Sequence, residues 1–247
     1  MISAVILTKN EEENIKKCLD CVLWCDEKLL IDDYSTDNTV DLARKLGAKV
    51  FERRLGKDFS AQRNFGISKA KNEWVLFIDA DEIVSDDLKK EILKKVQENK
   101  EINGYFIKRQ DFVFGKKIKH GEFGENSLVR LAKKNAGSWK GKVHEKWEIK
   151  GEVGKLTHTL EHFSHHSIDG FLRKINFYTD VRAKELYERG TKASFFSIII
   201  YPKLKFIQNY FLKLGFMDRT TGLVLAIMMS LHSFLVRGKL WLLWNKN

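Results

Sequence analysis

The chain has 247 residues, of which 43% are hydrophobic and 31% are charged, so it can form one large α/β domain or one domain with an appendage. Its formal net charge of +11 predicts an anionic partner: nucleic acid, a membrane surface or a phosphorylated substrate. We expect no secretory signal peptide, because Met1 leads directly into a strand pattern.

Short apolar runs alternate with helical patterns over the first hundred residues. Apolar residues recur at helical spacing after Glu12, near Ser35, from Gln62 to Ala70 and from about Ser85 to Gln97. The alternation predicts an α/β fold with a parallel, doubly wound sheet. We expect buried strands over 2–7, 29–31, 48–51 and 74–78.

Polar residues follow the first two of these strands. The first turn, Thr8-Lys9-Asn10-Glu11-Glu12, has no glycine fingerprint, which argues against a dinucleotide cofactor gripped through its pyrophosphate. The second strand ends in Asp32-Asp33, where Asp33 could accept a hydrogen bond from a nucleobase imide. Ser35 or Thr36 could cap the following helix. A capping turn alone gives no reason for the paired acids.

The fourth strand runs directly into Asp79-Ala80-Asp81-Glu82. Open α/β sheets hold their ligands at this end of their strands. Carboxylates gathered there repel one another unless a cation joins them, and oxygen ligands suit Mg²⁺ or Mn²⁺ that also bridges a substrate's phosphates. The alternative is a loop that caps the next helix, but Asp86 and Asp87 already fill that role. Arg63, near a helix start, could meet a diphosphate or could be a surface arginine.

Beyond residue 100 the pattern changes to strands and histidines. We expect strands over 104–109, 111–119 and 127–131, with a turn at Gly115. A further strand over 142–147 would point His144 and Glu145 to opposite faces, and we choose Glu145 for the cleft. The cluster His158, His162, His165 and His166 could be a metal site or a solvated surface, and one of these histidines could join the ion of the acidic loop.

The C-terminal region is basic and rich in aromatic residues. From Gly190 onward there are eight Lys or Arg, one acid and ten of the 29 aromatic residues, a composition that suits a membrane interface. We expect an amphipathic basic helix over 203–216, opened by Pro202. Residues 220–236 are at the shortest limit for a membrane span and contain several polar groups, so a monotopic or core-docked helix is favoured.

Four early motifs occur in a fixed order: Leu7-Thr8-Lys9-Asn10-Glu11-Glu12, Ile31-Asp32-Asp33-Tyr34-Ser35-Thr36-Asp37-Asn38-Thr39, Gln62-Arg63-Asn64 and Phe77-Ile78-Asp79-Ala80-Asp81-Glu82. In sequence and spacing they resemble the family 2 inverting glycosyltransferases of the nucleotide-diphospho-sugar (GT-A) fold. Later segments resemble its bacterial branch that includes lipopolysaccharide-core β-glucosyltransferases: Val143-His144-Glu145, His162, Lys174-Ile175-Asn176-Phe177-Tyr178, Lys205-Phe206 and Gly215-Phe216-Met217-Asp218. The resemblance covers nearly the whole chain.

The resemblance implies a nucleotide-sugar site with named residues. Asp33 would bind the uracil of a UDP-sugar, and the matching residues of the site are Thr8, Lys9, Asn10, Arg63, Asn64, Asp79 and Ala80. Asp81 would be the leading ligand of Mn²⁺ or Mg²⁺ on the diphosphate, with Asp79 and His162 beside it. Glu145 would be the general base for the acceptor hydroxyl, although this chain has His-Glu where much of the family has Glu-Asp. Asp41 and Glu82 receive no role.

The implied protein is a GT-A transferase with a mainly parallel central sheet, flanking helices and a C-terminal helical appendage. We expect a catalytic domain over 1–166, with a nucleotide-sugar half over 1–100 and an acceptor-side half over 101–166, and a helical membrane-association or acceptor region over 167–247. The expected reaction moves a hexose, glucose first, from a UDP-sugar to a lipid-linked or core oligosaccharide of a lipopolysaccharide or similar cell-envelope glycan.

The cysteines indicate the cellular compartment. Three cysteines, Cys18, Cys21 and Cys25, lack a fourth metal ligand and predict reduced core residues of a cytoplasmic protein. We expect the enzyme on the inner face of the cytoplasmic membrane, without nucleic acid as a partner. The alternatives are a polyprenyl-phosphate sugar synthase, a nucleotidyltransferase, and a non-catalytic basic protein that binds nucleic acid or membranes. The non-catalytic protein would explain the charge but not the acids at strand ends.

Overall fold

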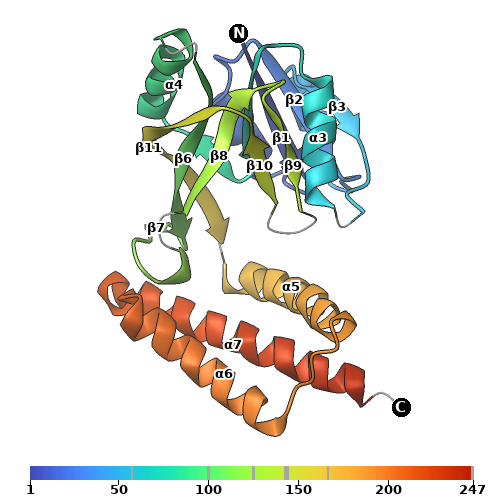
Figure 1. The fold of residues 1–247 in the computed structure, drawn as a ribbon, viewed down its shortest axis with the longest axis vertical. Coiled ribbons are helices and arrows are strands. Elements are labelled where there is room, and N and C mark those ends of the chain that lie inside the picture. The colour runs from blue at the N-terminus through green and yellow to red at the C-terminus, as the bar shows by residue number, and fades with distance from the viewer. Residues whose placement is uncertain (57, 99–100, 124–125, 142–144, 166, 246–247) are drawn as a thin grey trace. The chain divides into compact units, whose positions relative to one another are not determined.

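The computed structural model describes residues 1–247 except 57, 99–100, 124–125, 142–144, 166 and 246–247 (Figure 1). The chain divides into two compact units. The first consists of Met1–Arg109 and Asn126–His162, and the second of Gln110–Glu125 and Phe163–Asn247. The segment 110–125, which we expected in the catalytic domain, therefore packs with the C-terminal helices.

A mixed sheet forms the centre of the first unit, in the strand order β3-β2-β1-β4-β8-β6-β11-β5. Strands β3, β2, β1 and β4 are parallel, as predicted, whereas β8 runs antiparallel to β4 and to β6. A separate antiparallel pair is made by β9 and β10. The strands are β1 (Ile2–Thr8), β2 (Glu27–Asp32), β3 (Lys49–Glu52), β4 (Trp74–Asp79), β5 (Glu82–Val84), β6 (Ile102–Val113), β8 (Asn126–Lys133), β9 (Gly137–Lys140), β10 (Lys146–Ile149) and β11 (Glu152–His165).

Apolar side chains cover both faces of the parallel strands, which explains why these strands are continuous apolar runs. One face packs against α1 (Ile15–Asp20), α2 (Thr39–Lys45) and α4 (Asp86–Glu98). The other face packs against α3 (Phe59–Lys69) and the β9–β10 pair, which lies beside α3 in Figure 1. On that second face the rings of Phe77, Trp139 and Trp147 lie 5.1–5.4 Å apart and fill the core.

The second unit is mainly helical. Its elements are β7 (Lys116–Lys117), a 3₁₀ turn η1 (Gly121–Phe123), α5 (Ile168–Glu188), α6 (Phe195–Ile207), a π-helical turn η2 (Gln208–Leu212), a 3₁₀ turn η3 (Gly215–Asp218) and α7 (Arg219–Trp244). Both α5 and α6 pack against α7. The segment Gly215–Trp244 is, among the described residues, the one helix long and apolar enough to cross a membrane, and 33% of its most apolar window is buried within the protein.

Several element boundaries differ from those expected. The helix α3 begins at Phe59, because the Asp58 carboxylate accepts a hydrogen bond from the N–H of Ala61, so Arg63 lies in the second turn rather than at the helix start. The helix α2 begins at Thr39, beyond the expected cap at Ser35. Pro202 lies inside α6, whose true cap is Ser194. The expected strands 104–109 and 111–119 are instead one long strand, β6, and the short antiparallel strand β7. The turn predicted at Gly115 lies between β6 and β7, where Gly115 has φ of 71°.

Candidate functional site

The two acidic clusters lie at the same edge of the sheet in the first unit. In the strand register, Leu7 of β1 pairs with Ile31 of β2 on one side and with Asp79 of β4 on the other. The N–H of Asp33 donates to the carbonyl of Thr8, so the backbone at Asp33 continues this alignment past the end of β2. Neighbouring strands are about 4.8 Å apart, which puts the backbones at Asp33 and Asp79 on the order of 10 Å apart. The predicted convergence of the clusters on one strand edge is therefore present.

Asp33 is held by neighbours of the first turn. Its Oδ2 lies 2.8 Å from Lys9 Nζ, and its Oδ1 accepts the N–H of Leu55 at 2.9 Å. Partial burial opposes ionisation, but these hydrogen bonds outweigh it and lower the pKa of Asp33. Asp33 is thus an ionised acceptor at neutral pH, beside the exposed Lys9.

Asn10 shapes the loop next to Asp33. It has a left-handed backbone with φ of 54°, a conformation that asparagine tolerates. Its Oδ1 accepts the N–H of Thr36 at 2.8 Å, and its own N–H donates to Ser35 Oγ at 2.8 Å. Ser35 also donates to Asp32, so it ties the two loops together instead of capping a helix. Thr8, also expected in this pocket, is buried.

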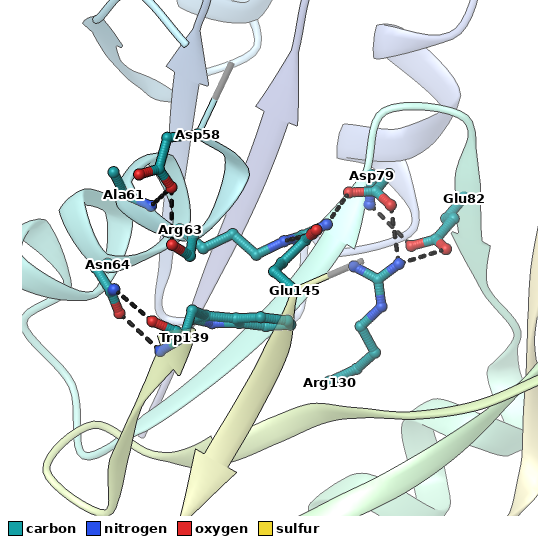
Figure 2. Close-up of polar contacts among 10 residues, drawn as sticks. Asp58, Ala61, Arg63, Asn64, Asp79, Glu82, Arg130, Trp139 and Glu145 are labelled. Atoms are coloured by element: carbon teal, nitrogen blue, oxygen red, sulfur yellow. Dashed lines mark hydrogen bonds and ion pairs between the residues drawn. The ribbon is translucent and has the colours of Figure 1, made fainter. Parts of the chain in front are cut away.

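Three acids and two arginines form a network at the end of β4 (Figure 2). Asp79 lies between the arginines: its Oδ1 is 3.1 Å from Arg63 Nη2, and its Oδ2 is 2.8 Å from Arg130 Nη2. Arg63 Nε also donates to Glu145 Oε1 at 2.9 Å, and Arg130 Nη2 donates to Glu82 Oε1 at 3.0 Å. The network thus connects Glu145, the expected base, to the expected ion-binding turn through a single guanidinium.

The network changes the acidity of its members in opposite directions. Burial opposes ionisation of Asp79, but the guanidinium groups of Arg130 and Arg63 outweigh it and lower the pKa of Asp79. Glu82 is fully buried, and this burial, with the charge of Asp79 beside it, raises the pKa of Glu82 despite its contact with Arg130. Burial opposes the positive charge of Arg130, but Asp79 and Glu82 outweigh it and raise the pKa of Arg130.

Asp81 points to a different neighbour from Asp79. Its Oδ2 lies 3.4 Å from His162 Nε2, and both side chains are largely buried. A carboxylate and an imidazole are ligands that Mn²⁺ accepts, and such ions take few protein ligands when substrate phosphates complete the shell. Asp81 and His162 therefore fit the protein's share of a phosphate-bridged ion by the chemistry of their donor atoms. No cluster of three or more potential metal-ligating side chains occurs among the described residues.

Asp79 fits that ion less well than we expected, because both of its oxygens already receive a guanidinium N–H. Buried donors without a partner are instead found nearby: within the described part of the chain, Arg63 Nη1 and Arg130 Nη1 have none. Unsatisfied buried donors are rare and predict an acceptor-rich ligand or ordered water. The donor set therefore suits an anionic group such as a diphosphate.

Two expected site residues have structural contacts. The side-chain amide of Asn64 donates to the carbonyl of Trp139 and accepts its N–H, each at 2.9 Å, so Asn64 joins α3 to β9 (Figure 2). Ala80 has a buried side chain that packs into the core. Of the expected strand over 142–147, residues 142–144 lie outside the described residues, and Glu145 directly precedes β10.

Two members of the network, Glu82 and Arg130, were not among the predicted site residues. Glu82 was recognised as part of the acidic motif but received no role; it begins β5, a strand of only three residues that is too short for a periodic pattern. Arg130 interrupts the apolar residues Val129 and Leu131 within an expected strand. A charged residue at such a position predicts a buried partner, and this signal could have identified Arg130.

Comparison with known proteins gives a family. The model of glycosyl transferase family 2 matches residues 3–176. An uncharacterized glycosyltransferase of Rickettsia typhi is 31% identical over 253 residues, covering 97% of this chain and 86% of the relative. The lipopolysaccharide core biosynthesis glycosyltransferase LpsC of Rhizobium meliloti is 26% identical over 247 residues, covering 97% of this chain and 92% of the relative.

Solved structures of similar shape have lower identity. S. aureus TarS 1–349, solved with UDP-GlcNAc, is 13% identical with a TM-score of 0.49, covering 100% of this chain and 92% of that chain. Glucosyl-3-phosphoglycerate synthase from Mycobacterium tuberculosis, solved with Mn²⁺, UDP and phosphoglyceric acid, is 16% identical with a TM-score of 0.48, covering 78% of this chain and 80% of that one.

Proposed function

The chain belongs to glycosyl transferase family 2 and is a glycosyltransferase of the GT-A fold class, and we propose that it transfers a hexose from a UDP-sugar with inversion. The proposed acceptor is a saccharide hydroxyl of a lipopolysaccharide or lipooligosaccharide core. The relationship to LpsC over 97% of the chain supports this class of acceptor, and glucose is the first sugar to test.

The observation that carries the proposal is the position of Arg63 between Glu145 and Asp79. One guanidinium connects a carboxylate from the segment before β10 to the acidic end of β4. A donor diphosphate at the strand edge and an acceptor hydroxyl at Glu145 would then share one site, as the transfer of a sugar between them requires.

The residues divide the chemistry between them. Asp33, with Thr8, Lys9 and Asn10, would bind the uracil end of the donor. Asp81 and His162 would hold Mn²⁺ or Mg²⁺, which when bound neutralises charge on the leaving diphosphate. Arg63 Nη1, which has no partner within the described part of the chain, would add a hydrogen bond to the same anion.

Glu145 would be the base. Arg63 binds one of its two oxygens, which fixes the carboxylate, and the other oxygen would accept the proton of the acceptor hydroxyl. Attack by that hydroxyl from the side opposite the diphosphate inverts the anomeric carbon, so an α-linked donor gives a β-linked product.

The second unit supports a location at the inner face of the cytoplasmic membrane. Between Gly190 and the C-terminus the chain has eight basic residues and one acid, and α6 has no buried residue. Basic and aromatic surfaces of this kind bind anionic lipid headgroups. In this proposal residues 167–247 bring the enzyme to a lipid-linked acceptor.

The test compares Asp81→Ala and Glu145→Gln with the parent enzyme. We expect Asp81→Ala to lose Mn²⁺-dependent transfer, and Glu145→Gln to lower turnover by about 10²–10⁴-fold, the usual contribution of a general base, while UDP affinity stays within about twofold. Turnover is measured as UDP release from a panel of UDP-sugars, and UDP affinity by calorimetry.

Asp41→Ala is the matched control, because Asp41 is an exposed acid on α2 and has no proposed role. A fully active Asp81→Ala enzyme would exclude the ion site, and unchanged turnover in Glu145→Gln would exclude the base. Mass analysis of the product identifies the acceptor: a sugar on a polyprenyl phosphate, rather than on a core saccharide, would make the enzyme a polyprenyl-phosphate sugar synthase.

A further inference from the structure

Arg130 reaches the acidic turn from the antiparallel side of the first unit. It lies on β8, is 3% exposed, and uses one nitrogen, Nη2, for two carboxylates: Asp79 Oδ2 at 2.8 Å and Glu82 Oε1 at 3.0 Å. These two acids stand at the two ends of the turn Asp79-Ala80-Asp81-Glu82. Arg130 therefore joins the end of β4 to the start of β5, as Figure 2 shows.

Glu82 also binds the backbone at the start of this turn. Its Oε2 accepts the N–H of Asp79 at 2.8 Å, while its backbone pairs with His162 of β11 in antiparallel register. Glu82 therefore binds Arg130 through its side chain and lies opposite His162 through its backbone. The position of Asp81, the residue before Glu82, depends on both contacts.

This arrangement separates the two aspartates of the motif. Asp79 is occupied by Arg63 and Arg130, whereas Asp81 points to His162, 3.4 Å away. Without the guanidinium of Arg130, the carboxylates of Asp79 and Glu82 would repel each other across a buried turn, and burial would strongly disfavour that state. The turn would then have to open or change its shape, which would move Asp81 away from His162.

We propose that Arg130 is a positioning residue of the transfer reaction: through Asp79 and Glu82 it holds Asp81 opposite His162 in the geometry that binds the divalent cation. The inference rests on the proposed function in one respect, namely that Asp81 is a ligand of that cation.

The experiment measures Mn²⁺ binding by electron paramagnetic resonance, in the presence of saturating UDP, for the parent enzyme, Arg130→Met, Arg130→Lys and Asp81→Ala. We expect Arg130→Met to weaken Mn²⁺ binding at least tenfold, and by a larger factor than it weakens UDP binding in the absence of metal, because Arg130 Nη1 would add only one hydrogen bond to the diphosphate. Arg130→Lys keeps the positive charge but replaces the planar guanidinium with a compact ammonium group, so its Mn²⁺ affinity should lie between those of the parent and Arg130→Met. Raising the Mn²⁺ concentration should restore part of the turnover of Arg130→Met.

Lys133→Met is the matched control, since Lys133 is a cation on the same strand, β8, donates to Asn103, and pairs with Trp74 at the opposite end of β4 from Asp79. It should leave Mn²⁺ affinity unchanged. If Arg130→Met does not fold, as judged by circular dichroism, Arg130→Lys and Glu82→Gln provide the same test, because each weakens the contact without removing every charge.

The outcomes separate the two proposals. Parent affinity for Mn²⁺ in folded Arg130→Met or, failing that variant, in Arg130→Lys and Glu82→Gln, together with lost affinity in Asp81→Ala, overturns the role of Arg130 and leaves the proposed ion site intact. A parent enzyme that binds no Mn²⁺, or an Asp81→Ala variant that binds it normally, overturns the ion site itself and the role of Arg130 with it.

Discussion

At the scale of single residues, Asp79 is bound on both sides by arginines. Its two oxygens each bind a different arginine, and its N–H binds Glu82. Charge-assisted hydrogen bonds on both sides favour the ionised form, which is why the pKa of Asp79 is lowered in spite of burial. Asp79 therefore stabilises the folded protein at neutral pH.

The corresponding prediction concerns Asp79→Asn. Removing the charge leaves Arg63 and Arg130 with one acid each, so we expect a loss of about 2 kcal/mol in the free energy of unfolding at pH 7, less than for a fully enclosed pair because Asp79 is 30% exposed. A carboxyl with a lowered pKa gives stability that is present above its unfolded pKa of about 3.9 and is lost as the pH falls further.

The measurement is urea unfolding of parent and variant at pH 7, 5 and 3. The difference between the two proteins should be constant from pH 7 to pH 5 and smaller at pH 3. Other acids with lowered pKa values, such as Asp33, are present in both proteins and cancel in the difference. A difference that grows toward acid pH would contradict the assignment.

Residue identities at the site were predictable where the chain brings them together locally. Asp33, Asp79 and Asp81 follow strands, so the end of each strand indicated their position. Arg130 was not predictable in this way, because it meets Asp79 only through the pairing of β8 with β4, 51 positions along the chain. Sequence periodicity gives the face of a strand but not its neighbour in the sheet.

At the scale of elements, a pair of glycines joins η3 to α7. A Cβ atom on Gly222 would overlap the carbonyl oxygen of Gly215, so the first turn of α7 packs directly on the backbone of η3. The turn η3 ends at Asp218, whose carboxylate accepts the N–H of His120 at 2.8 Å and lies 3.2 Å from His120 Nδ1. The Gly-Phe-Met-Asp segment is therefore a structural junction within the second unit.

We predict opposite signs for two glycine substitutions in α7. Gly222→Ala should destabilise the protein by about 1–3 kcal/mol, because the added methyl forces the backbones apart. Gly238→Ala is the matched control: a Cβ there meets nothing within 4 Å, and alanine favours a helix over glycine by about 1 kcal/mol. Thermal unfolding of both variants checks the pair, and equal shifts would contradict the close packing.

Elements were predictable according to their length and periodicity. The parallel strands were found because each is an uninterrupted apolar run. Pro202 misled the assignment of α6, because proline is common at a helix start. The helix in fact begins at Phe195, after the N-cap Ser194, which forms a capping box with Ser197, and it continues through the proline. The strand β11 was missed because its histidines obscured the alternation.

At the scale of the whole molecule, charge and exposed aromatic residues are concentrated in the second unit. Phe195 and Phe196 at the start of α6 are 70% and 71% exposed, and Lys203 and Lys205 follow on the same helix. In water such exposure is unfavourable, whereas at a lipid surface the rings and cations both find partners. The helix expected over 203–216 is thus α6, Phe195–Ile207, followed by η2, Gln208–Leu212, and α6 is the element that we propose for the membrane surface.

The prediction is that Phe195→Ser with Phe196→Ser weakens binding to vesicles containing anionic phospholipid by about tenfold or more, since each buried ring contributes on the order of 1–2 kcal/mol. Leu23→Ser is the control, as an exposed apolar residue of the first unit. Sedimentation with vesicles at low and high salt measures the hydrophobic and the electrostatic contributions to binding. Unchanged vesicle binding of the double variant would show that α6 does not contact the membrane.

The register of β2, β1 and β4 has a consequence for the evolution of donor choice. Backbone hydrogen bonds fix how far Asp33 stands from Asp79, so no side-chain substitution can lengthen or shorten that interval. In the proposed site, the sheet would set the distance between the nucleobase and the diphosphate before a ligand binds. A relative that used a purine nucleotide in place of a uracil nucleotide would need a different loop after β3, where the N–H of Leu55 donates to Asp33, and could keep the same strands.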